Sequence, residues 1–530
     1  MSAVDVRPAR PRPFAAVRFP AIPARAVELA AVAALMAWAV HARTRDLGAP
    51  LWIDEGISLG VANHALTAIP GVLREDGAPP LFYLVLHVWT GLFGSTPRSG
   101  HALSLLFAVL AVPAAYWATL RPFGGRAGVL AAAIVALDPF VGTYAIEVRM
   151  YSLLLLLGLL ATGAFLRAFV VPDGGRRWAV AFAVALAAVL YTHNWGLFFA
   201  AAAGIVWLGL LLGARGPERR KVLVAGAIGF GGAALLFLPW LPTVLYQARH
   251  TGAPWSHVPH VRSIATAFER LFGGHAAETA VLLLTLVGAG ALVRPWGTPV
   301  ARAALAMVVL TAVTFAIAYT WSNVSSPAWA VRYLVIVLAP AAVVVGAGLS
   351  RLGPLAAVAL AIVFISSWYG VPTHASLAHK SNAGYVAHRL GAGLPPGSVV
   401  FSTQPEQVPL LHLSLPPGLR YYTPLGRVRD PRVMDWRDAM PRLARPDVAR
   451  TFRRLLAALP PGGRLLLVQP RFQSPSAPWT RRIRQLARRA RHDLERAHGI
   501  RVVRKVVPHR GYNRVTVAGT LLERRAGSAR

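Results

Sequence analysis

Residues 149–169 read RMYSLLLLLGLLATGAFLRAF, and this stretch decides the fold class. No Asp, Glu, Lys or Arg lies between Arg149 and Arg167. About 20 consecutive apolar residues in an α-helix are enough to span the hydrocarbon core of a bilayer. A helix also satisfies its own backbone hydrogen bonds, as lipid requires. The stretch therefore predicts a transmembrane helix and an integral membrane protein.

The composition of the whole chain agrees with this prediction. Of its 530 residues, 55% are hydrophobic and only 14% are charged, whereas about 25% of residues are charged in soluble globular proteins. There is no cysteine, which excludes disulfides, cysteine-type zinc sites and thiol chemistry. The net charge of +34 favours anionic partners. Because membrane segments are present, we expect lipid headgroups or a phosphorylated substrate as partners and no nucleic acid.

Twelve apolar runs are candidate spans. They lie near 26–42, 80–94, 101–119, 127–141, 149–169, 178–192, 196–213, 222–245, 278–293, 303–320, 332–348 and 354–369. The positive-inside rule places short basic connections in the cytoplasm. Five such connections occur, at 120–126, 173–177, 215–221, 294–302 and 350–353. All five fall on the cytoplasmic side only if the short run at 79–94 does not cross.

We therefore predict an all-α polytopic membrane domain with about 11 transmembrane helices. Residues 1–25 form a basic cytoplasmic tail, and residues 26–370 form the membrane domain. The first outer loop, residues 43–100, is expected to hold juxtamembrane helices, one of which begins after Pro79–Pro80. The predicted location is the plasma membrane, with the N-terminus in the cytoplasm.

Residues 371–530 are predicted to form a small extracytoplasmic α/β domain. This segment carries 29 Lys and Arg against 8 Asp and Glu, and it lacks long apolar runs. Four β-like runs alternate with Arg-rich helical stretches, namely 398–403, 464–470, 501–507 and 513–522.

Acidic residues concentrate at the predicted outer rim of the membrane domain. The chain has only 21 Asp and Glu, and the first outer loop holds Asp46, Asp54, Glu55, Glu75 and Asp76. The second outer segment, 142–148, holds Glu147. Charges at a bilayer boundary are costly unless they are paired or hydrated, so each is a candidate functional residue.

The pair Asp54–Glu55 admits two interpretations. In the first, Asp54 caps the helix that follows and the helix dipole favours Glu55. In the second, the pair supplies a general base together with an orienting or metal-binding partner. The two are compatible, and two further acids of the same loop, Glu75 and Asp76, are expected to converge on the site.

Glu147, Arg149 and Tyr151 stand at the start of a predicted span. They are either a local ion pair with an aromatic anchor, or an acid and a phosphate-binding Arg that face one outer cavity. On a helix, Glu147 and Tyr151 would share one face. Arg332 and Tyr333 open a later span, where Arg332 either snorkels to the interface or binds a phosphate through its planar fork.

Two histidines are weaker candidates, His193 in YTHNW and His64 in VANHAL. A lone histidine is more often a hydrogen-bonded structural residue than a ligand. No P-loop, dinucleotide-binding, HExxH or Ser/His/Asp pattern stands out in the sequence. If the protein is an enzyme, its activated substrate is therefore not bound through a nucleotide fold.

Several of these segments together carry a family resemblance. In chain order they are WIDEG (52–56), DGAPPLFYLVLHVW (76–89), GSTPR (94–98), YAIEVRMYSLLLLL (144–157), YTHNWGL (191–197), LPWLP (238–242) and AWAVRYL (328–334). In this order and spacing the chain resembles a bacterial GT-C glycosyltransferase close to family 39, the type of the protein O-mannosyltransferases and lipid A aminoarabinose transferases. The resemblance covers most of 26–345, whereas 371–530 matches no acceptor-binding module of the family.

The resemblance implies an enzyme that moves a sugar from a polyprenyl-phosphate donor to an acceptor hydroxyl, by a single inverting displacement. Asp54 or Glu55 would be the base, and Asp54 is favoured. By position, Glu147, Arg149, Tyr151, His193, Arg332 and Tyr333 would bind the donor phosphate or substrate. A divalent metal, Mg or Mn, would be held by Asp54, Glu55 and Glu147 if one is used. The acceptor stays open as a glycan, lipid or protein.

Two other classes compete with a transferase. A polyprenyl-lipid flippase or other multi-pass transporter would show internal repeats and charges near the bilayer midplane. No convincing repeat is visible, and the acids gather at one rim. A non-catalytic scaffold would tolerate the loss of Asp54.

Overall fold

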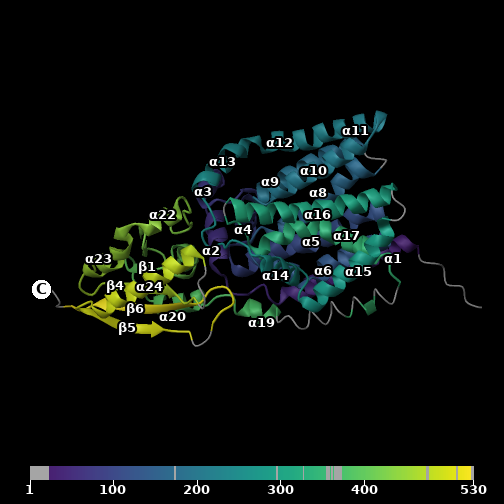
Figure 1. Cartoon of the computed structure of the whole chain (residues 1–530). Coiled ribbons are helices and arrows are strands. Elements are labelled where there is room, and N and C mark those ends of the chain that lie inside the picture. The colour runs from purple at the N-terminus through teal and green to yellow at the C-terminus, as the bar shows by residue number, and fades with distance from the viewer. Residues whose placement is uncertain are drawn as a thin grey trace, which may run out of the picture.

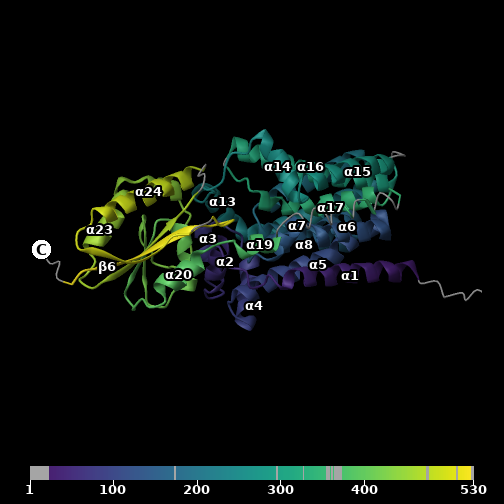
Figure 2. The same ribbon diagram turned by 90° about the horizontal axis from the view of Figure 1, so that it is seen from below.

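The computed structural model describes residues 23–171, 175–293, 297–325, 327–353, 358–359, 362, 373–472, 477–508 and 511–526. It consists of an elongated helical bundle with a smaller sheet-containing part at one end (Figure 1). The view turned by 90° shows the same end-to-end arrangement (Figure 2). The helices α2 and α3 lie at the junction between the two parts in both views.

Within the described residues, seven helical segments are long and apolar enough to cross a membrane. They are α1 (Ala24–Thr44), α5 (Pro97–Phe123), α8 with η1 (Tyr151–Val170), α10 (Gly196–Gly213), the run from α11 to α13 (Gly216–His250), α16 (Pro299–Val324) and η4 with α17 (Val331–Leu349). The helices α6 (Gly125–Leu137) and α7 (Pro139–Ala145) meet at a bend of 56° and together make an eighth candidate.

Two further predicted span positions also carry helices. They are α9 (Arg176–Thr192), which has 17 residues, and α15 (His275–Val293), which has 19. The predicted span 354–369 falls mostly outside the described residues. A count of eleven spans stays a prediction, because length and apolarity qualify seven helices, or eight with the bent pair.

Burial separates the centre of the bundle from its lipid-facing edge. Every residue of α17 (Val335–Leu349) is buried, as expected for a helix that is hydrophobic all round and surrounded by other helices. In α1, only 11% of the apolar window is buried inside the protein. The remaining surface of α1 is apolar and suits contact with lipid.

Residues 43–100, predicted to be the first outer loop, contain three short helices besides the ends of the flanking spans, which confirms the prediction of short helices in this segment. They are α2 (Ile53–Ala62), α3 (Ile69–Asp76) and α4 (Leu81–Phe93). The run at 79–94 indeed forms a helix of 13 residues that begins after Pro80. Val88, Leu92 and Phe93 on α4 are more than half exposed, which suits a helix that lies along the membrane surface.

The C-terminal part contains one six-stranded sheet in the order β3-β2-β1-β4-β6-β5. The strands are β1 (Val399–Ser402), β2 (Arg420–Thr423), β3 (Gly426–Arg427), β4 (Arg464–Pro470), β5 (Ile500–Val506) and β6 (Val517–Arg524). β1 runs parallel to β2 and β4, and the other pairs are antiparallel. The four predicted β-runs are β1, β4, β5 and β6, so the α/β prediction is confirmed, although β2 and β3 were not predicted.

Two glycines let the C-terminal part pack directly on α2. A Cβ at Gly56 would lie 2.7 Å from the Cβ of Leu410 in α21 (Val408–Ser414), and a Cβ at Gly60 would lie 1.9 Å from the carbonyl oxygen of Arg432. Backbone approaches this close exclude any side chain at these two positions. The helix that carries Asp54 is therefore held between the membrane bundle and the sheet domain.

Candidate functional site

The N-terminus of α2 differs from the predicted cap. Trp52, not Asp54, is the N-cap residue, and Asp54 is already inside the helix. Glu55 supplies the capping contact, because its Oε2 accepts a hydrogen bond of 3.1 Å from the backbone N–H of Trp52. An acid at the third helical position that reaches back to the cap is one half of a capping box. Asp54 is thereby left without a capping role.

Glu55 is fully buried and its oxygens are occupied. Lys380 Nζ lies 2.9 and 3.1 Å from the two carboxylate oxygens, and His101 Nε2 lies 2.6 Å from Oε1. The backbone N–H of Val148 also donates to Oε1, at 2.9 Å. Burial alone would raise the pKa of Glu55, but Lys380 and His101 outweigh it and lower the pKa to about 2. A saturated carboxylate of this kind is suited to holding structure.

Asp54 faces two arginines without being saturated by them. Its Oδ2 lies 3.6 Å from Arg332 Nη2 and 4.0 Å from Arg149 Nε, and its side chain is 19% exposed. Both distances exceed those of a formed hydrogen bond. The side chain of Asp54 therefore lies beside two positive charges, but these two groups do not occupy its oxygens at hydrogen-bond distance.

Arg149 comes from the turn that precedes α8. Its Nη1 lies 3.3 Å from Ser58 Oγ, 3.4 Å from Tyr83 Oη and 3.5 Å from the carbonyl oxygen of Asp54. The helix begins only at Tyr151. The prediction that Glu147 and Tyr151 share one helix face is therefore wrong, because residues 146–150 form a turn that ends the bent span.

Arg332, in the short helix η4 (Val331–Leu334), is surrounded by aromatic rings. Its guanidinium carbon lies 4.6 Å from the ring centre of Trp255, 5.4 Å from Tyr333 and 5.9 Å from Trp52. Rings at this distance attract a cation through their negative faces. The aromatic neighbours fix the guanidinium beside Asp54 without consuming its N–H groups.

Three more predicted residues join this group. The ring of Tyr333 lies 4.5 Å from that of His193 and 6.3 Å from that of Tyr151. Arg149 lies 5.8 Å from the ring of Tyr151. His193 Nδ1 accepts the backbone N–H of Trp195 at 3.0 Å. Six of the predicted site residues therefore gather in one place: Asp54, Arg149, Tyr151, His193, Arg332 and Tyr333.

Four buried hydrogen-bond donors have no acceptor, three of them in this group and one on the neighbouring Trp52. They are Arg149 Nε, Arg332 Nε, Tyr151 Oη and the indole nitrogen of Trp52. Buried donors are nearly always satisfied in folded proteins, so each unpaired one needs an explanation. Donors that converge without acceptors suit an anion with several oxygens, such as a phosphate.

The sequence did not predict that Tyr83 contacts Arg149. It predicted that both Glu75 and Asp76 converge on the site, but only Asp76 does. Glu75 forms a surface ion pair of 3.1 Å with Arg437 and lies apart from the site. Asp76 is coupled to the site: burial raises its pKa to about 7, against the lowering effect of Arg149 and with a further rise from Asp54. No sequence signal separates these two adjacent acids, because only their positions around the axis of α3 decide which of them is more buried.

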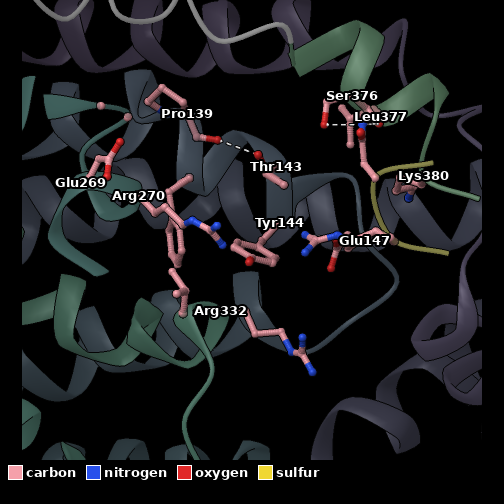
Figure 3. A pocket seen from close by; sticks show the side chains of 16 residues that line it. Pro139, Thr143, Tyr144, Glu147, Glu269, Arg270, Arg332, Ser376, Leu377 and Lys380 are labelled. Carbon is pink, nitrogen blue, oxygen red and sulfur yellow. Dashed lines mark hydrogen bonds and ion pairs between the residues drawn. The ribbon is translucent and has the colours of Figure 1, made fainter. Parts of the chain in front are cut away.

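Glu147 lies beside the group and is paired with the C-terminal domain. Its Oε1 accepts a hydrogen bond of 2.8 Å from Arg514, while its Oε2 is buried without a partner. Burial raises the pKa of Glu147, although Arg514 and Lys380 act in the opposite direction. A pocket of about 510 Å³ opens here (Figure 3), with Glu147, Arg270 and Lys380 among its lining residues.

The residues predicted to hold a divalent metal do not fit one. Glu55 is bonded to Lys380 and His101, and Glu147 is bonded to Arg514. Metal sites need oxygen ligands that converge, and here cations already occupy these carboxylates. No group of three or more His, Cys, Asp or Glu suited to a metal ion occurs in the described part of the chain.

Comparison with known proteins shows which solved structures share this fold. No family model and no curated protein matches the chain. A solved structure of ArnT from Cupriavidus metallidurans bound to undecaprenyl phosphate is similar with a TM-score of 0.64 and 15% identity, over 95% of this chain and 99% of ArnT. The arabinofuranosyltransferase AftD from Mycobacteria gives 0.55 and 15%, over 96% of this chain and 40% of AftD.

The archaeal oligosaccharyltransferase AglB from Archaeoglobus fulgidus, in complex with an inhibitory peptide and a dolichol-phosphate, is similar with a TM-score of 0.52 and 11% identity. That match covers 73% of this chain and 63% of AglB. These neighbours are membrane glycosyltransferases of the GT-C superfamily. The predicted fold, a GT-C type membrane domain with a small C-terminal sheet domain, is therefore confirmed.

Proposed function

We propose that this GT-C fold carries a membrane glycosyltransferase that moves a sugar from a polyprenyl-phosphate donor to an acceptor hydroxyl. ArnT, which has the same fold over nearly its whole length, binds undecaprenyl phosphate. In this proposal the bundle lies in the plasma membrane with the N-terminus in the cytoplasm. The candidate site and the C-terminal domain then lie on the extracytoplasmic side, as the distribution of basic connections predicts.

The observation that carries the proposal is the set of unpaired donors around Asp54. Arg149 Nε, Arg332 Nε and Tyr151 Oη are buried and lack acceptors, and Asp54 lies within 4.0 Å of both guanidinium groups. A phosphate held by these donors would lie in the same site as the carboxylate of Asp54. One site would then hold both a group that can activate a nucleophile and cations that can receive the leaving group.

In the proposed reaction the acceptor hydroxyl oxygen attacks the anomeric carbon of the donor sugar. The new glycosidic C–O bond forms as the bond between that carbon and the phosphate oxygen breaks, so the configuration inverts. The hydroxyl proton passes to the carboxylate of Asp54, which lies beside two guanidinium groups. A hydroxyl is a poor nucleophile at neutral pH, and a positioned base contributes about 10²- to 10⁴-fold in rate.

The leaving lipid phosphate gains one negative charge in this step. Arg149 and Arg332 neutralise it, and a guanidinium fork matches the geometry of phosphate oxygens. Tyr151 and Trp52 offer neutral donors to the same oxygens. Because the rings of Trp255 and Tyr333 already hold Arg332, little reorganisation is needed during the reaction.

The test measures transfer of radiolabelled sugar from polyprenyl-phosphate donors by the purified protein in detergent. Asp54→Asn keeps the size and polarity of the side chain but removes the base, so we expect transfer to fall at least 10²-fold. Asp447→Asn, on the exposed surface of the C-terminal domain, is the matched control and should leave transfer unchanged. Full transfer by Asp54→Asn would remove Asp54 as the base.

A further inference from the structure

A second pocket lies between the membrane bundle and the C-terminal domain. Its volume is about 340 Å³, and Asp54, Trp52 and Arg332 form its membrane side. Glu406 and Trp436 lie among the residues that line it from the C-terminal domain. This volume is at the lower end of the range of about 300–1,000 Å³ for pockets that bind small molecules. It suits a ring-sized group and not a folded partner.

This pocket and the pocket beside Glu147 share two lining residues. Arg332 and Arg514 line both pockets, whereas Asp54 lines only the interdomain pocket. A base must lie on the side from which the nucleophile arrives. If Asp54 is the base, as proposed above, the interdomain pocket is the place for the acceptor.

Two residues that line the interdomain pocket, Glu406 and Gln404, each have one buried side-chain oxygen without a partner. Glu406 is 6% exposed and Gln404 is 5% exposed. Glu406 Oε1 accepts hydrogen bonds from Gln404 Nε2 at 2.8 Å and from Trp479 Nε1 at 2.9 Å. Glu406 Oε2 and Gln404 Oε1 have no partner. Both of these atoms are acceptors, so a ligand that satisfies them must bring O–H or N–H groups.

The walls of the pocket are rich in aromatic rings. Trp52, Trp255, Trp436, Phe472 and Tyr512 all line it. An aromatic face carries partial negative charge and attracts groups whose hydrogens carry partial positive charge. A sugar ring meets both demands, because its C–H face packs on an aromatic ring while its hydroxyls point sideways to acceptors.

We propose that the interdomain pocket binds a sugar residue of a glycan acceptor, and that Glu406 and Gln404 receive its hydroxyl groups while Asp54 faces the hydroxyl that reacts. This inference rests on the proposed function and narrows its acceptor to a carbohydrate. A peptide acceptor would bring one side-chain hydroxyl to Asp54. It would leave the unpaired oxygens of Glu406 and Gln404 to backbone N–H groups, and a pocket of about 340 Å³ has little room for a further chain segment.

The test measures binding and not turnover, so its result can be distinguished from the result of the transfer assay that tests the proposed function. Saturation-transfer NMR with the purified protein in detergent measures the binding of methyl glycosides of common hexoses and pentoses. Short Ser/Thr peptides serve as the second probe in the same measurement. Thermal-shift titration with undecaprenyl phosphate monitors the donor site in the same samples. Wild type is expected to bind at least one glycoside and the lipid phosphate.

Three variants assign the glycoside contact. Gln404→Leu and Glu406→Gln each remove or replace one unpaired oxygen and are expected to weaken glycoside binding about tenfold or more, with unchanged lipid binding. Glu406→Gln keeps an acceptor for Trp479, so it guards against misfolding. Gln407→Leu is the matched control, because Gln407 is also buried with unpaired amide atoms but does not line the pocket.

The outcomes separate the two proposals. Loss of glycoside binding in Gln404→Leu but not in Gln407→Leu supports the inference. Binding of peptides and not glycosides, or equal loss in the control, overturns it while lipid binding still stands. Failure of undecaprenyl phosphate to bind wild type counts against the proposed donor, whatever the glycosides do.

Discussion

Replacing Lys380 by Met should destabilise the protein by about 3 kcal/mol or more. The ammonium group of Lys380 lies 2.9 Å from Glu55 in a fully buried cluster, and it also donates to the carbonyl oxygen of Ile146 at 3.0 Å. Lys380 and His101 lower the pKa of Glu55 despite its burial, so they stabilise the carboxylate form. Removing one partner of a buried ion pair costs about 3–5 kcal/mol.

The sign of the pH dependence follows from the lowered pKa. The wild-type stabilisation is fully present above pH 4.5 and is lost as the pH falls through the range down to about 2. In Lys380→Met the carboxylate keeps only His101 and backbone donors, so its pKa rises. The destabilisation should therefore be larger at pH 8 than at pH 5, where protonation of Glu55 relieves it.

The measurement is equilibrium denaturation in mixed micelles with a double-mutant cycle. Lys380→Met, Glu55→Gln and the double variant are compared with Lys505→Met, which alters an exposed lysine and should change the free energy of unfolding by less than about 0.5 kcal/mol. The double variant should lose clearly less than the sum of the single variants. Additivity within about 0.5 kcal/mol would refute the ion-pair account.

Three further expectations concern the site and the domain contact. Arg332→Lys should weaken undecaprenyl phosphate binding about tenfold in a thermal-shift titration, because lysine lacks the planar fork; unchanged affinity would count against a fork contact. Lipid phosphate affinity should fall as pH rises through about 7, since Asp76 ionises there beside the anion site, and Asp76→Asn should flatten this profile. A profile that persists in Asp76→Asn would assign it to another group. Gly60→Val should loosen the C-terminal domain, because its Cβ meets the Arg432 carbonyl oxygen at 1.9 Å; limited proteolysis should then cleave the variant faster than Gly71→Val, where the added Cβ meets open space.

The gathering of Asp54, Arg149, Arg332 and Tyr333 could be predicted from the sequence. Charged and aromatic residues at the ends of apolar runs are visible in a linear pattern, and the positive-inside rule places those ends on one side. Local signals also located the helix after Pro80 and four of the six strands. These features depend on neighbours within a few residues or on the simple periodicity of spans and strands.

The partners from the C-terminal domain could not be predicted in the same way. Lys380 and Arg514 reach Glu55 and Glu147 across 325 and 367 residues of chain, and nothing in the local sequence marks either basic residue among so many arginines. The cap of α2 was misassigned because Trp52 is an unusual N-cap residue, while the acid three positions later supplies the contact. Burial, and not residue type, separates Asp54 from Glu55.

The buried contact between Glu55 and Lys380 also constrains how the protein is made. Synthesis proceeds at about 5–20 residues per second, so the 325 residues that separate the pair take roughly 15–65 s to translate. During that interval the first outer loop is already outside the ribosome, but the cation that neutralises its buried acid does not yet exist. The loop therefore reaches its final form late, after the last membrane segments, and an incomplete chain would keep Asp54 in an unformed site.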